Sequence, residues 1–308
     1  MNSPRPSIRP LQRPLLAVDW GTTSLRAAWC PDDRVLDTRH SDQGILKVTP
    51  GEFPQVLRSL CGDWLDHPRV LCLISGMAGS AQGWQLAPYC PCPAGGSDLS
   101  GHLHWIEPGR IALVPGLSCE LAHAPDVMRG EEVQIFGAMQ LHGLRDARVV
   151  LPGTHSKWVQ VQDGRIQYFS THMTGEIYAL LRQHSILSRT LRAMHSAEPV
   201  DAQAFDRGVK LSLGPGGLLH HVFSTRTLSL MERATPEALA SYLSGLIIGE
   251  ELRTQSLAAG STVWVIGSEA LQSRYQRALA LLDVQTHCLG DTATWSGLMA
   301  LAQTLRHS

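Results

Sequence analysis

The residues with the clearest chemical potential lie near the start of the chain, in the stretch LLAVDWGTTSLRAAW at 15–29. A carboxylate, Asp19, closes an apolar run and is followed by a turn of small and hydroxylated residues. Glycine allows a backbone to approach an anion closely, and consecutive turn amides form an anion-binding concavity. An acid beside such a turn suits a Mg²⁺ ion that arrives with a phosphate, because this ion prefers one or two carboxylates together with phosphate oxygens. The candidate phosphate ligands are Gly21, Thr22, Thr23 and Ser24, although an ordinary β-hairpin with a polar turn explains them equally well.

A second stretch, VVLPGTHSKWVQV at 149–161, repeats this arrangement. The two copies share the pattern G-T-x-S, and each lies between two predicted strands and leads through a D-x-R turn to a third. The repeated order predicts that the chain consists of duplicated halves. Two such loops would hold the β- and γ-phosphates of ATP between two domains. The residues of the second loop are Gly153, Thr154, His155, Ser156 and Lys157.

Acidic residues gather at 126–132 (DVMRGEE), where a helix over 131–142 is predicted to begin. Acids in a first helical turn are favoured by the helix dipole, so Glu131 and Glu132 can be simple caps. Together with Asp126 and Arg129 they equally suit an active site. The residues leave both interpretations open.

Two predicted buried strands, 70–74 and 262–266, end in loops of small residues. In open α/β sheets ligands bind outside the carboxyl ends of strands, so both loops are candidate site walls. The first loop is SGMAGS at 75–80, and plain strand-to-helix geometry explains it equally well. The second contains Gly267 and Ser268, which could approach an adenine base, although a plain turn is the simpler explanation.

Composition limits the class of protein. The chain has 308 residues, 44% of them hydrophobic and 17% charged, which suits two globular domains with ample cores. A net charge of −1 gives no electrostatic argument for binding nucleic acid or an anionic membrane. No apolar run is long enough to span a membrane. Residues 1–13, rich in Pro and Arg, lack a signal-peptide core, so we expect a disordered tail on a cytoplasmic protein. The seven cysteines are irregularly spaced and indicate reduced thiols.

Periodicity predicts the elements around these loops. Further strands are expected at 34–40, 111–114 and 284–288, and an ordered irregular excursion at 82–100. Helices are expected at 54–66, 176–186, 202–213, 236–257, 269–282 and 292–305. The chain contains no G-x-x-x-x-G-K-[ST], no G-x-G-x-x-G after a strand and no G-x-S-x-G. These absences argue against a P-loop enzyme, a Rossmann dinucleotide site and an α/β-hydrolase.

Four motifs together resemble the 2-dehydro-3-deoxygalactonokinase family of sugar-acid kinases: VDWGTTSLRAAW, SGMAGSAQGWQLAPY, DVMRGEEVQIFGA and LPGTHSKWVQ. The resemblance runs from about residue 15 to 305 and is most specific in the first half. It implies the α/β fold of the actin, hexokinase and heat-shock ATPase superfamily, with two ribonuclease-H-like domains flanking an ATP cleft. The domains would be 14–146 and 147–308, and the last helix, 292–305, could pack back on the first domain.

The resemblance also implies an activity, the transfer of the ATP γ-phosphate to the C6 hydroxyl of 2-dehydro-3-deoxy-D-galactonate. Asp19 would then lie near Mg²⁺, residues 21–24 and 153–157 would bind phosphates, and Gly267 with Ser268 would contact adenosine. Leu151 and Pro152 stand where the superfamily usually has an acid, which argues against metal binding by the second domain. A homodimer is the oligomeric state that the family suggests.

In related sugar kinases an acid at the start of the corresponding helix accepts the proton of the substrate hydroxyl. The resemblance favours Glu131 for this role, with Asp126 and Glu132 as rivals. A substrate carboxylate needs a cation, preferably an arginine, and Arg129 and Arg26 are the candidates. The substrate could be enclosed by Met77, Ala78, Gly79 and Trp84, although a structural role for Trp84 is the simpler explanation.

Two other functions fit the same residues. A related kinase could act on another ketodeoxy acid such as the gluconate epimer, because the sequence does not show which orientation of one substrate hydroxyl the site selects. A phosphatase or an ATP-gated binding module could also use this fold. A repressor would need a helix-turn-helix extension, which thirteen residues rich in Pro and Arg cannot supply.

Overall fold

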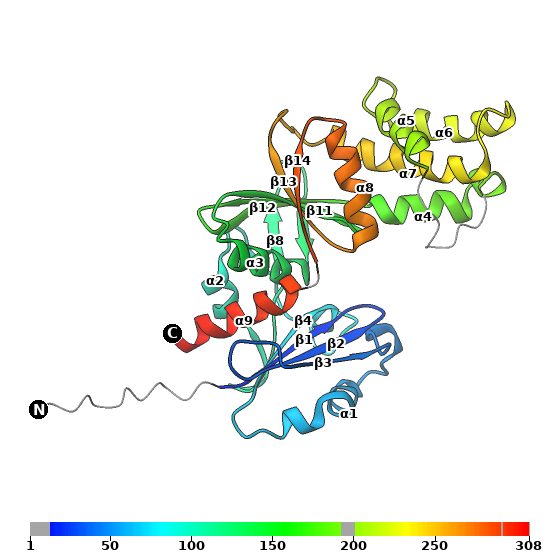
Figure 1. Cartoon of the computed structure of the whole chain (residues 1–308). Helices are drawn as coiled ribbons and strands as arrows, with labels where there is room; N and C mark the ends of the chain where they lie inside the picture. The colour runs from blue at the N-terminus through cyan, green and yellow to red at the C-terminus, as the bar shows by residue number, and fades with distance from the viewer. Residues whose placement is uncertain (1–12, 192–200, 291, 308) are drawn as a thin grey trace, which may run out of the picture. The chain divides into compact units, whose positions relative to one another are not determined.

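The computed structural model describes residues 13–191, 201–290 and 292–307 (Figure 1). The chain forms two compact units. The first contains the residues up to 146, residues 161–168 and the C-terminal segment from 291, and the second contains 147–160 and 169–290. Most of the predicted N-terminal tail, residues 1–12, lies outside the described residues.

The first unit is built on a six-stranded sheet in the order β3-β2-β1-β4-β7-β6. β1 pairs antiparallel with β2 and parallel with β4, so Asp19 lies opposite Arg26 on one side and Ser75 on the other. A separate small sheet has the order β5-β8-β9. The strands are β1 (Leu15–Trp20), β2 (Leu25–Cys30), β3 (Asp37–Ser41), β4 (Leu71–Gly76), β5 (Cys90–Pro91), β6 (His104–Glu107), β7 (Ile111–Leu113), β8 (Leu117–Glu120) and β9 (Pro125–Met128).

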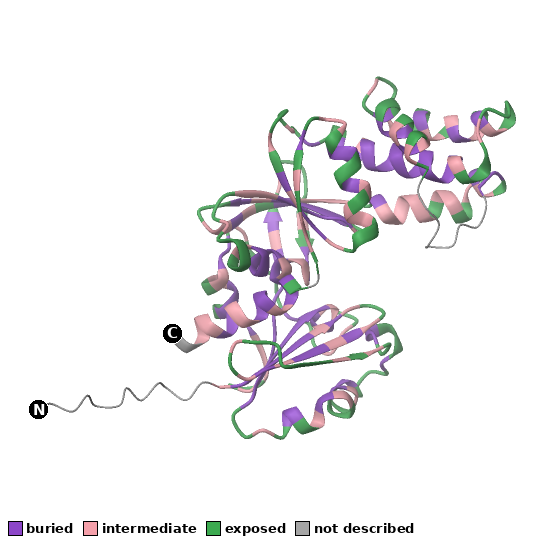
Figure 2. Ribbon diagram, viewed as in Figure 1, coloured by how far each residue is buried: buried purple, intermediate pink, exposed green. Residues whose placement is uncertain are grey.

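Helices cover both faces of this sheet (Figure 1). α1 (Phe53–Leu65) packs on the face that carries Leu16, Val18 and Trp20, and these side chains form one hydrophobic core. Side chains alternate between the faces of a strand, so Asp19 belongs to the opposite face, where α9 (Thr292–His307) contacts β1 and β4. The strand alternation therefore places the one acid of β1 outside the core, and Figure 2 shows the buried character of these central strands.

α9 also packs along α3 (Glu131–His142), and two glycines allow the close approach. A β-carbon on Gly137 would lie 1.7 Å from the carbonyl oxygen of Ala293, and one on Gly297 would lie 1.9 Å from that of Val133. The two backbones are in direct contact, so any side chain at either glycine would separate the helices. The first unit also contains the short helix α2 (Gly96–Gly101), which contacts α9.

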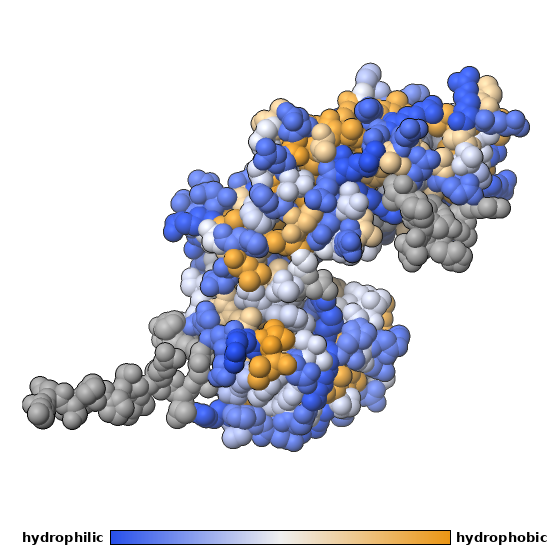
Figure 3. All heavy atoms as spheres, in the orientation of Figure 1, coloured by the Kyte–Doolittle hydropathy of each residue, from blue (hydrophilic) through white to orange (hydrophobic). Residues whose placement is uncertain are grey.

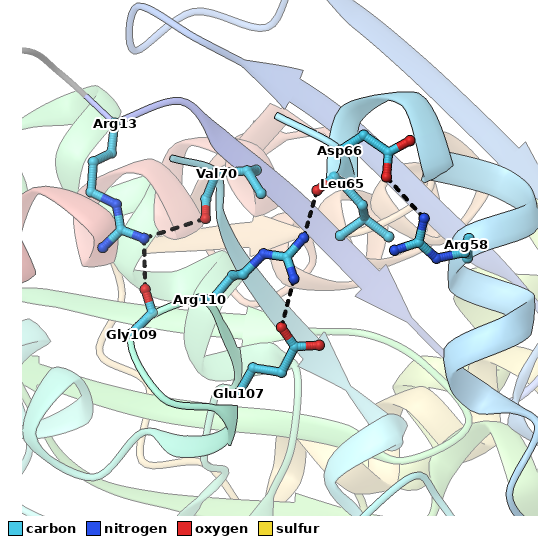
Figure 4. A network of polar contacts seen from close by, with 8 residues as sticks. All are labelled: Arg13, Arg58, Leu65, Asp66, Val70, Glu107, Gly109 and Arg110. Carbon is cyan, nitrogen blue, oxygen red and sulfur yellow. Dashed lines mark hydrogen bonds and ion pairs between the residues drawn. The ribbon is translucent and has the colours of Figure 1, made fainter. Parts of the chain in front are cut away.

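Polar contacts fix the start of β1 (Figure 4). Arg13 donates from Nη2 to the carbonyl oxygens of Gly109 at 2.6 Å and Val70 at 3.3 Å. Beside it, Arg110 donates to the carbonyl oxygen of Leu65 and to Glu107, both at 2.7 Å. Because these bonds join the chain before β1 to the segments flanking β4 and β7, they help to set the register in which Asp19 meets its neighbours.

The second unit contains most of a five-stranded sheet in the order β12-β11-β10-β13-β14. β13 pairs parallel with both β10 and β14. The first unit has the same order of strands. In both sheets the three strands that come first in the chain lie side by side, and later strands that run parallel lie on the other side of the first strand, β1 or β10. This shared order confirms the predicted duplication. The strands are β10 (Ala147–Leu151), β11 (Ser156–Gln162), β12 (Arg165–His172), β13 (Thr262–Ile266) and β14 (Gln285–Leu289).

A helical block accompanies this sheet, and its core is formed by residues such as Tyr242, Leu243 and Leu246. The helices are α4 (Thr174–His184), α5 (Ala202–Ser212), α6 (Gly217–Leu230), α7 (Pro236–Arg253) and α8 (Glu269–Ala280). Short 3₁₀ turns occur at Ile45–Lys47 and Met77–Gly79 in the first unit and at Ile186–Arg189 in the second. On the face drawn in Figure 3, hydrophilic and hydrophobic residues are interspersed over both units. Within the described ranges, no helix has the length and apolar character needed to cross a bilayer.

Several predicted boundaries were wrong. The third strand begins at Asp37 instead of 34, because residues 31–36 form a turn and an irregular segment. The helix expected over 236–257 ends at Arg253, since the next residues adopt irregular structure. α6 was not predicted at all, because its apolar residues occur on all sides and give no helical periodicity; Leu219 and Phe223, for example, are exposed.

Candidate functional site

The first candidate loop, residues 21–24, is a tight turn between β1 and β2. The amide of Gly21 donates to the carbonyl oxygen of Ser24 at 2.9 Å, which closes the turn. The carbonyl oxygens of Gly21 and Thr22 accept from the amides of Ile45 and Leu46. The loop thus has its carbonyl groups turned to the protein, while Thr22 and Thr23 are exposed at its tip. Such a turn can present hydroxyls and amides to an anion.

Asp19 lies at the base of this loop. Its Oδ2 accepts from Arg26 at 2.6 Å (Nη2) and 3.2 Å (Nε), and both side chains are partly exposed. The Arg26 guanidinium lies 5.8 Å from the ring centre of Trp295 in α9. Arg26 is therefore occupied by Asp19 and an aromatic ring, which makes it a less direct ligand for a substrate carboxylate than the sequence suggested.

The loop after β4 meets the start of α3 beside Asp19. Gly76 has a φ of 93°, and a β-carbon there would lie 2.7 Å from the Trp20 carbonyl oxygen and 3.4 Å from Oδ1 of Asp19. Gly130 has a φ of 106°, and a β-carbon on it would lie 3.3 Å from the Cα of Gly76. Only glycine adopts such angles without strain and leaves room for this contact. The two glycines allow the turn after β4 and the start of α3, which are far apart in the sequence, to come into contact beside Asp19.

Arg129 is buried at this place. Its Nη2 donates to the carbonyl oxygen of Ala87 at 2.8 Å, and its guanidinium carbon lies 4.4 Å from the ring centre of Tyr89. Nη1 faces Gly79, where a β-carbon would lie only 2.8 Å away. Nε and Nη1 have no hydrogen-bond partner among the described residues. A buried cation with unused donors is costly unless a ligand satisfies it.

Glu132 is fully buried beside Arg129. Its Oε2 accepts from the amide of Gly130 at 2.7 Å, whereas its Oε1 has no partner among the described residues. Burial, and secondarily the charge of Glu131, raises the pKa of Glu132 to about 8. A carboxyl group that titrates near neutral pH suits general acid–base chemistry.

The other two acids differ from Glu132. Glu131 is only half-buried, and its Oε2 accepts from the amide of Arg129 at 3.0 Å. Asp126 lies on β9, where Oδ1 accepts from the amide of Val127 at 2.7 Å. Both acids hold backbone amides at the approach to α3.

Unpartnered buried polar atoms concentrate in this cluster. Within the described part of the first unit, all such side-chain atoms belong to Ser75, Ser80, Arg129 and Glu132. Ser75 precedes Gly76, and Ser80 follows Gly79, so each flanks a glycine that touches the start of α3 or the Arg129 side chain. Native proteins leave few buried polar groups without partners, so this concentration makes the cluster the candidate ligand site of the first unit. Ser75 and Ser80 lie in the loop that the sequence predicted as a candidate site, and Tyr89 lies in one of the family motifs, but none of the three was predicted as an individual site residue.

The other residues predicted to enclose the substrate, Met77, Ala78 and Trp84, make contacts within the protein core. Ala78 is buried and its carbonyl oxygen accepts from the amide of Trp84 at 2.7 Å. The Trp84 ring lies 6.3 Å from the rings of both Trp20 and Phe53, in the core beneath the sheet. Met77 packs against the same core. These residues shape the turn that carries Gly79.

In the second unit, residues 153–157 cover the turn between β10 and β11 and the first two residues of β11. The loop side chains are tied to neighbouring helices: His155 Nε2 lies 2.5 Å from Glu176 Oε2, and Ser156 Oγ lies 2.9 Å from the Tyr275 hydroxyl. Lys157 is buried and donates to Thr171 Oγ1 at 2.8 Å. Thr154 and His155 are the exposed residues of this loop, and Gly153 is partly exposed.

Gly267 and Ser268 lie at the same edge of the sheet. β10 and β13 run parallel, and a β-carbon on Gly267 would lie 3.6 Å from the carbonyl oxygen of Pro152. Gln272 donates to the carbonyl oxygen of Gly267 at 2.8 Å, which fixes the turn, and Ser268 is the exposed N-cap residue of α8. The predicted phosphate loop and the predicted adenosine loop are thus neighbours within this unit.

Arg274 is a candidate residue that the sequence did not reveal. Its Nε is buried without a partner among the described residues. It lines a narrow cavity of about 50 Å³ together with Gly153, Gly175 and Leu271. In the sequence, Arg274 is one of two arginines in an amphipathic helix, and only the packing of α8 against the loop distinguishes it from Arg277, which forms an ion pair with Asp206.

Each unit therefore contains some of the predicted site residues. The first brings together Asp19, Arg26 and residues 21–24 with the loop 76–79 and the start of α3, and the second joins residues 153–157 with 267–268. Across the described segments, no three side chains of His, Cys, Asp or Glu come close enough to bind a metal among themselves.

The chain is similar to known proteins over almost its whole length. The family model for 2-keto-3-deoxy-galactonokinase matches residues 19–301. A 2-dehydro-3-deoxygalactonokinase of Escherichia coli K12 is 32% identical over 94% of this chain and 98% of its own length. A "probable 2-dehydro-3-deoxygalactonokinase" of Rhizobium meliloti is 33% identical over 94% and 96%. The crystal structure of a "putative 2-dehydro-3-deoxygalactonokinase protein" from Sinorhizobium meliloti, 32% identical, matches with a TM-score of 0.86 over 94% of this chain and 99% of that one.

Proposed function

The chain belongs to the 2-keto-3-deoxy-galactonokinase family, and from this premise we propose that it transfers the γ-phosphoryl group of ATP to the C6 hydroxyl of 2-dehydro-3-deoxy-D-galactonate. The observation that carries the acceptor site is the cluster of unpartnered buried polar atoms around Arg129 and Glu132. Phosphoryl transfer requires mainly positioning, charge neutralisation and a group that accepts the hydroxyl proton. The first unit offers these elements at one place.

Arg129 is our candidate for binding the substrate carboxylate. Its guanidinium is held by Ala87 and Tyr89, so its orientation is fixed before a ligand arrives. Its unused Nε–H and Nη1–H groups suit oxygen acceptors, and a charge-assisted hydrogen bond to a carboxylate is stronger than one to a neutral group. Arg26, the other candidate, already binds Asp19. Gly79 lies against Arg129, because the guanidinium occupies the space that a side chain at position 79 would take.

We assign the general base to Glu132. The sequence favoured Glu131, but Glu132 combines complete burial with a free Oε1. In its ionised form Oε1 would accept the proton of the C6 hydroxyl as that oxygen bonds to the γ-phosphorus and ADP leaves. The pKa of about 8 allows the ionised form to be populated in the physiological range. Glu131 and Asp126 would then orient the backbone around it.

The nucleotide-binding residues are proposed in both units. In the second unit, the backbone of residues 153–154 would contact phosphates, and Gly267, Ser268 and Arg274 would contact adenosine. In the first unit, residues 21–24 would offer amides and hydroxyls to phosphate. His155, Ser156 and Lys157 would support the second loop through their contacts with Glu176, Tyr275 and Thr171.

Asp19 fits one position of a Mg²⁺ ion. It is an acid at the end of a strand beside a phosphate-binding turn, and its Oδ1 borders Gly76, where a side chain would crowd it. Magnesium commonly takes one or two carboxylates and completes its shell with phosphate oxygens and water. When bound, the ion would neutralise phosphate charge. Arg26 neutralises Asp19 in its absence.

The decisive experiment measures ADP release from Mg–ATP under four acceptor conditions in parallel. The acceptors are 2-dehydro-3-deoxygalactonate, its epimer 2-dehydro-3-deoxygluconate and simple hexoses, and the fourth condition has no acceptor. We expect strong turnover with 2-dehydro-3-deoxygalactonate alone and a product that carries phosphate at C6, which phosphorus NMR identifies. Preference for the epimer would change the substrate assignment. Equal ADP release without an acceptor would overturn the kinase proposal in favour of an ATPase or phosphatase.

A further inference from the structure

Glu251 is a buried carboxyl group on α7 that the proposed reaction does not use. It is only 3% exposed, and it is surrounded by donors from three other elements. Its Oε1 accepts from Trp158 Nε1 at 2.6 Å, and its Oε2 accepts from the Tyr275 hydroxyl at 2.8 Å and from Thr174 Oγ1. Within the described residues these partners are an indole and two hydroxyls, so no cation neutralises the carboxylate.

These partners connect Glu251 with the C-terminal side of the loop at 153–157. Trp158 follows the loop directly on β11. Tyr275 also hydrogen-bonds Ser156 Oγ at 2.9 Å, so a continuous chain of bonds runs from Glu251 through Tyr275 to the loop. Burial, together with the charge of Glu251, raises the pKa of Tyr275 well above its ordinary value, so the phenol stays a hydrogen donor.

The third partner connects Glu251 with the N-terminal side of the same loop. Thr174 begins α4, and the next two residues touch the loop backbone. A β-carbon on Gly175 would lie 2.5 Å from the carbonyl oxygen of Gly153, and the amide of Glu176 donates to the carbonyl oxygen of Thr154 at 3.0 Å. Both sides of the loop are therefore held, through short chains of contacts, by one carboxyl group.

We propose that Glu251 is a positioning residue that sets the shape of the loop at 153–157 and thereby the affinity for nucleotide. This inference rests on the proposed function, which assigns phosphate binding to that loop. A negative charge beneath an anion-binding loop opposes phosphate binding, so a carboxyl group there is best explained by its hydrogen-bond geometry. A small displacement of a positioning group can cost about a hundredfold in activity.

The test compares Glu251→Ala with the matched control Glu250→Ala. Glu250 is the preceding residue and pairs with Arg253 near the surface. We expect Glu251→Ala to raise the KM for ATP and the dissociation constant of Mg–AMPPNP about tenfold or more, with the KM for the sugar acid nearly unchanged. The control should match the parent protein. Unchanged nucleotide affinity in folded Glu251→Ala, or an equal loss for both substrates, would overturn the proposal.

Glu251→Gln separates geometry from charge. The glutamine oxygen can accept from Trp158, and its NH₂ group can donate to the hydroxyls of Thr174 and Tyr275, which reverse their roles. We therefore expect Gln to restore most of the affinity that Ala loses; a Gln variant as weak as Ala would contradict the geometric role. If Glu251→Ala does not fold, Tyr275→Phe removes one bond of the network and should weaken Mg–AMPPNP binding about threefold to tenfold. No effect of Tyr275→Phe would then overturn the proposal.

The two proposals fail differently. A parent protein that binds no Mg–AMPPNP would contradict the proposed function itself. Normal binding by the parent together with normal binding by folded Glu251→Ala would contradict only the role of Glu251, whatever acceptor the enzyme uses.

Discussion

Gly79 and Arg129 lie so close that a β-carbon at position 79 would stand 2.8 Å from the Nη1 atom of Arg129. The turn after β4 thus lies directly against a guanidinium that belongs to the segment before α3. Neither residue is near the other in sequence, and their contact defines one wall of the proposed acceptor site. The contact also makes the site sensitive to a single methyl group.

Gly79→Ala should therefore impair binding of the sugar acid. The methyl group would displace the guanidinium, and we expect the KM for the acid to rise about tenfold to a hundredfold while the KM for ATP changes little. Steady-state kinetics with each substrate varied in turn measures this. Gly101→Ala is the control, because no atom lies within 4 Å of its β-carbon position. Equal kinetics for the two variants would refute the contact.

Arg129→Lys should lose affinity for the carboxylate while keeping the charge. Lysine has no planar fork, and it would also leave the Ala87 carbonyl oxygen and the Tyr89 ring without their partner. We expect the KM for the acid to rise about thirtyfold, equivalent to about 2 kcal/mol. A substrate analogue with an amide in place of the carboxylate should be used equally poorly by the parent and the variant. If Arg129→Lys discriminates acid from amide as the parent does, another group binds the carboxylate.

Activity should depend on the ionisation of Glu132. Burial raises the pKa of this group to about 8, and a general base must be ionised. We therefore expect kcat/KM to rise about tenfold per pH unit below pH 7, to bend near pH 8 and to level off only above it. Glu132→Gln should abolish this dependence along with nearly all turnover, whereas Glu131→Gln should keep a dependence of the same form, moved to lower pH because the charge of Glu131 helps to raise the pKa of Glu132. A profile that is flat from pH 6 to 9 would exclude Glu132 as the base.

Stability should depend on the same group in the opposite direction. The folded carboxyl has a pKa above its ordinary value of 4.5, so the folded state binds the proton more tightly than the unfolded state. Its contribution to the free energy of unfolding is complete below about pH 4.5 and is lost as the pH rises to about 8. Glu132→Gln should therefore reduce the loss of stability between pH 5 and pH 8, by roughly a few kcal/mol. Urea unfolding at both pH values measures this, and parallel pH dependences of parent and variant would contradict it.

The contact between α3 and α9 should tolerate no side chain. A β-carbon on Gly137 would lie 1.7 Å from the Ala293 carbonyl oxygen, so Gly137→Ala must move a helix, at a cost of about 3 kcal/mol or more. Gly62→Ala is the contrasting variant, because its β-carbon would make only ordinary contact inside α1. There the better helix propensity of alanine should stabilise the protein by about 0.5–1 kcal/mol. Thermal unfolding of the two variants should shift in opposite directions, and a shift in the same direction would refute this account.

Much of this arrangement is predictable from local sequence. The bounds of α3 and β13 agree with the expected 131–142 and 262–266, because an acidic first turn and an unbroken apolar run are strong local signals. The repeated loop pattern predicted the duplicated sheet order. The contact of Gly76 with Gly130, the burial of Arg129 and the network of Glu251 were not predictable, since each depends on which distant segments meet.

The packing of α9 also affects the order in which the protein can be completed during synthesis. The first unit includes the last helix of the chain, and that helix lies directly against α3. A ribosome makes every residue of the second unit before it reaches α9. The first unit therefore becomes complete only after every residue of the second unit has been synthesised, although synthesis of the first unit starts earlier.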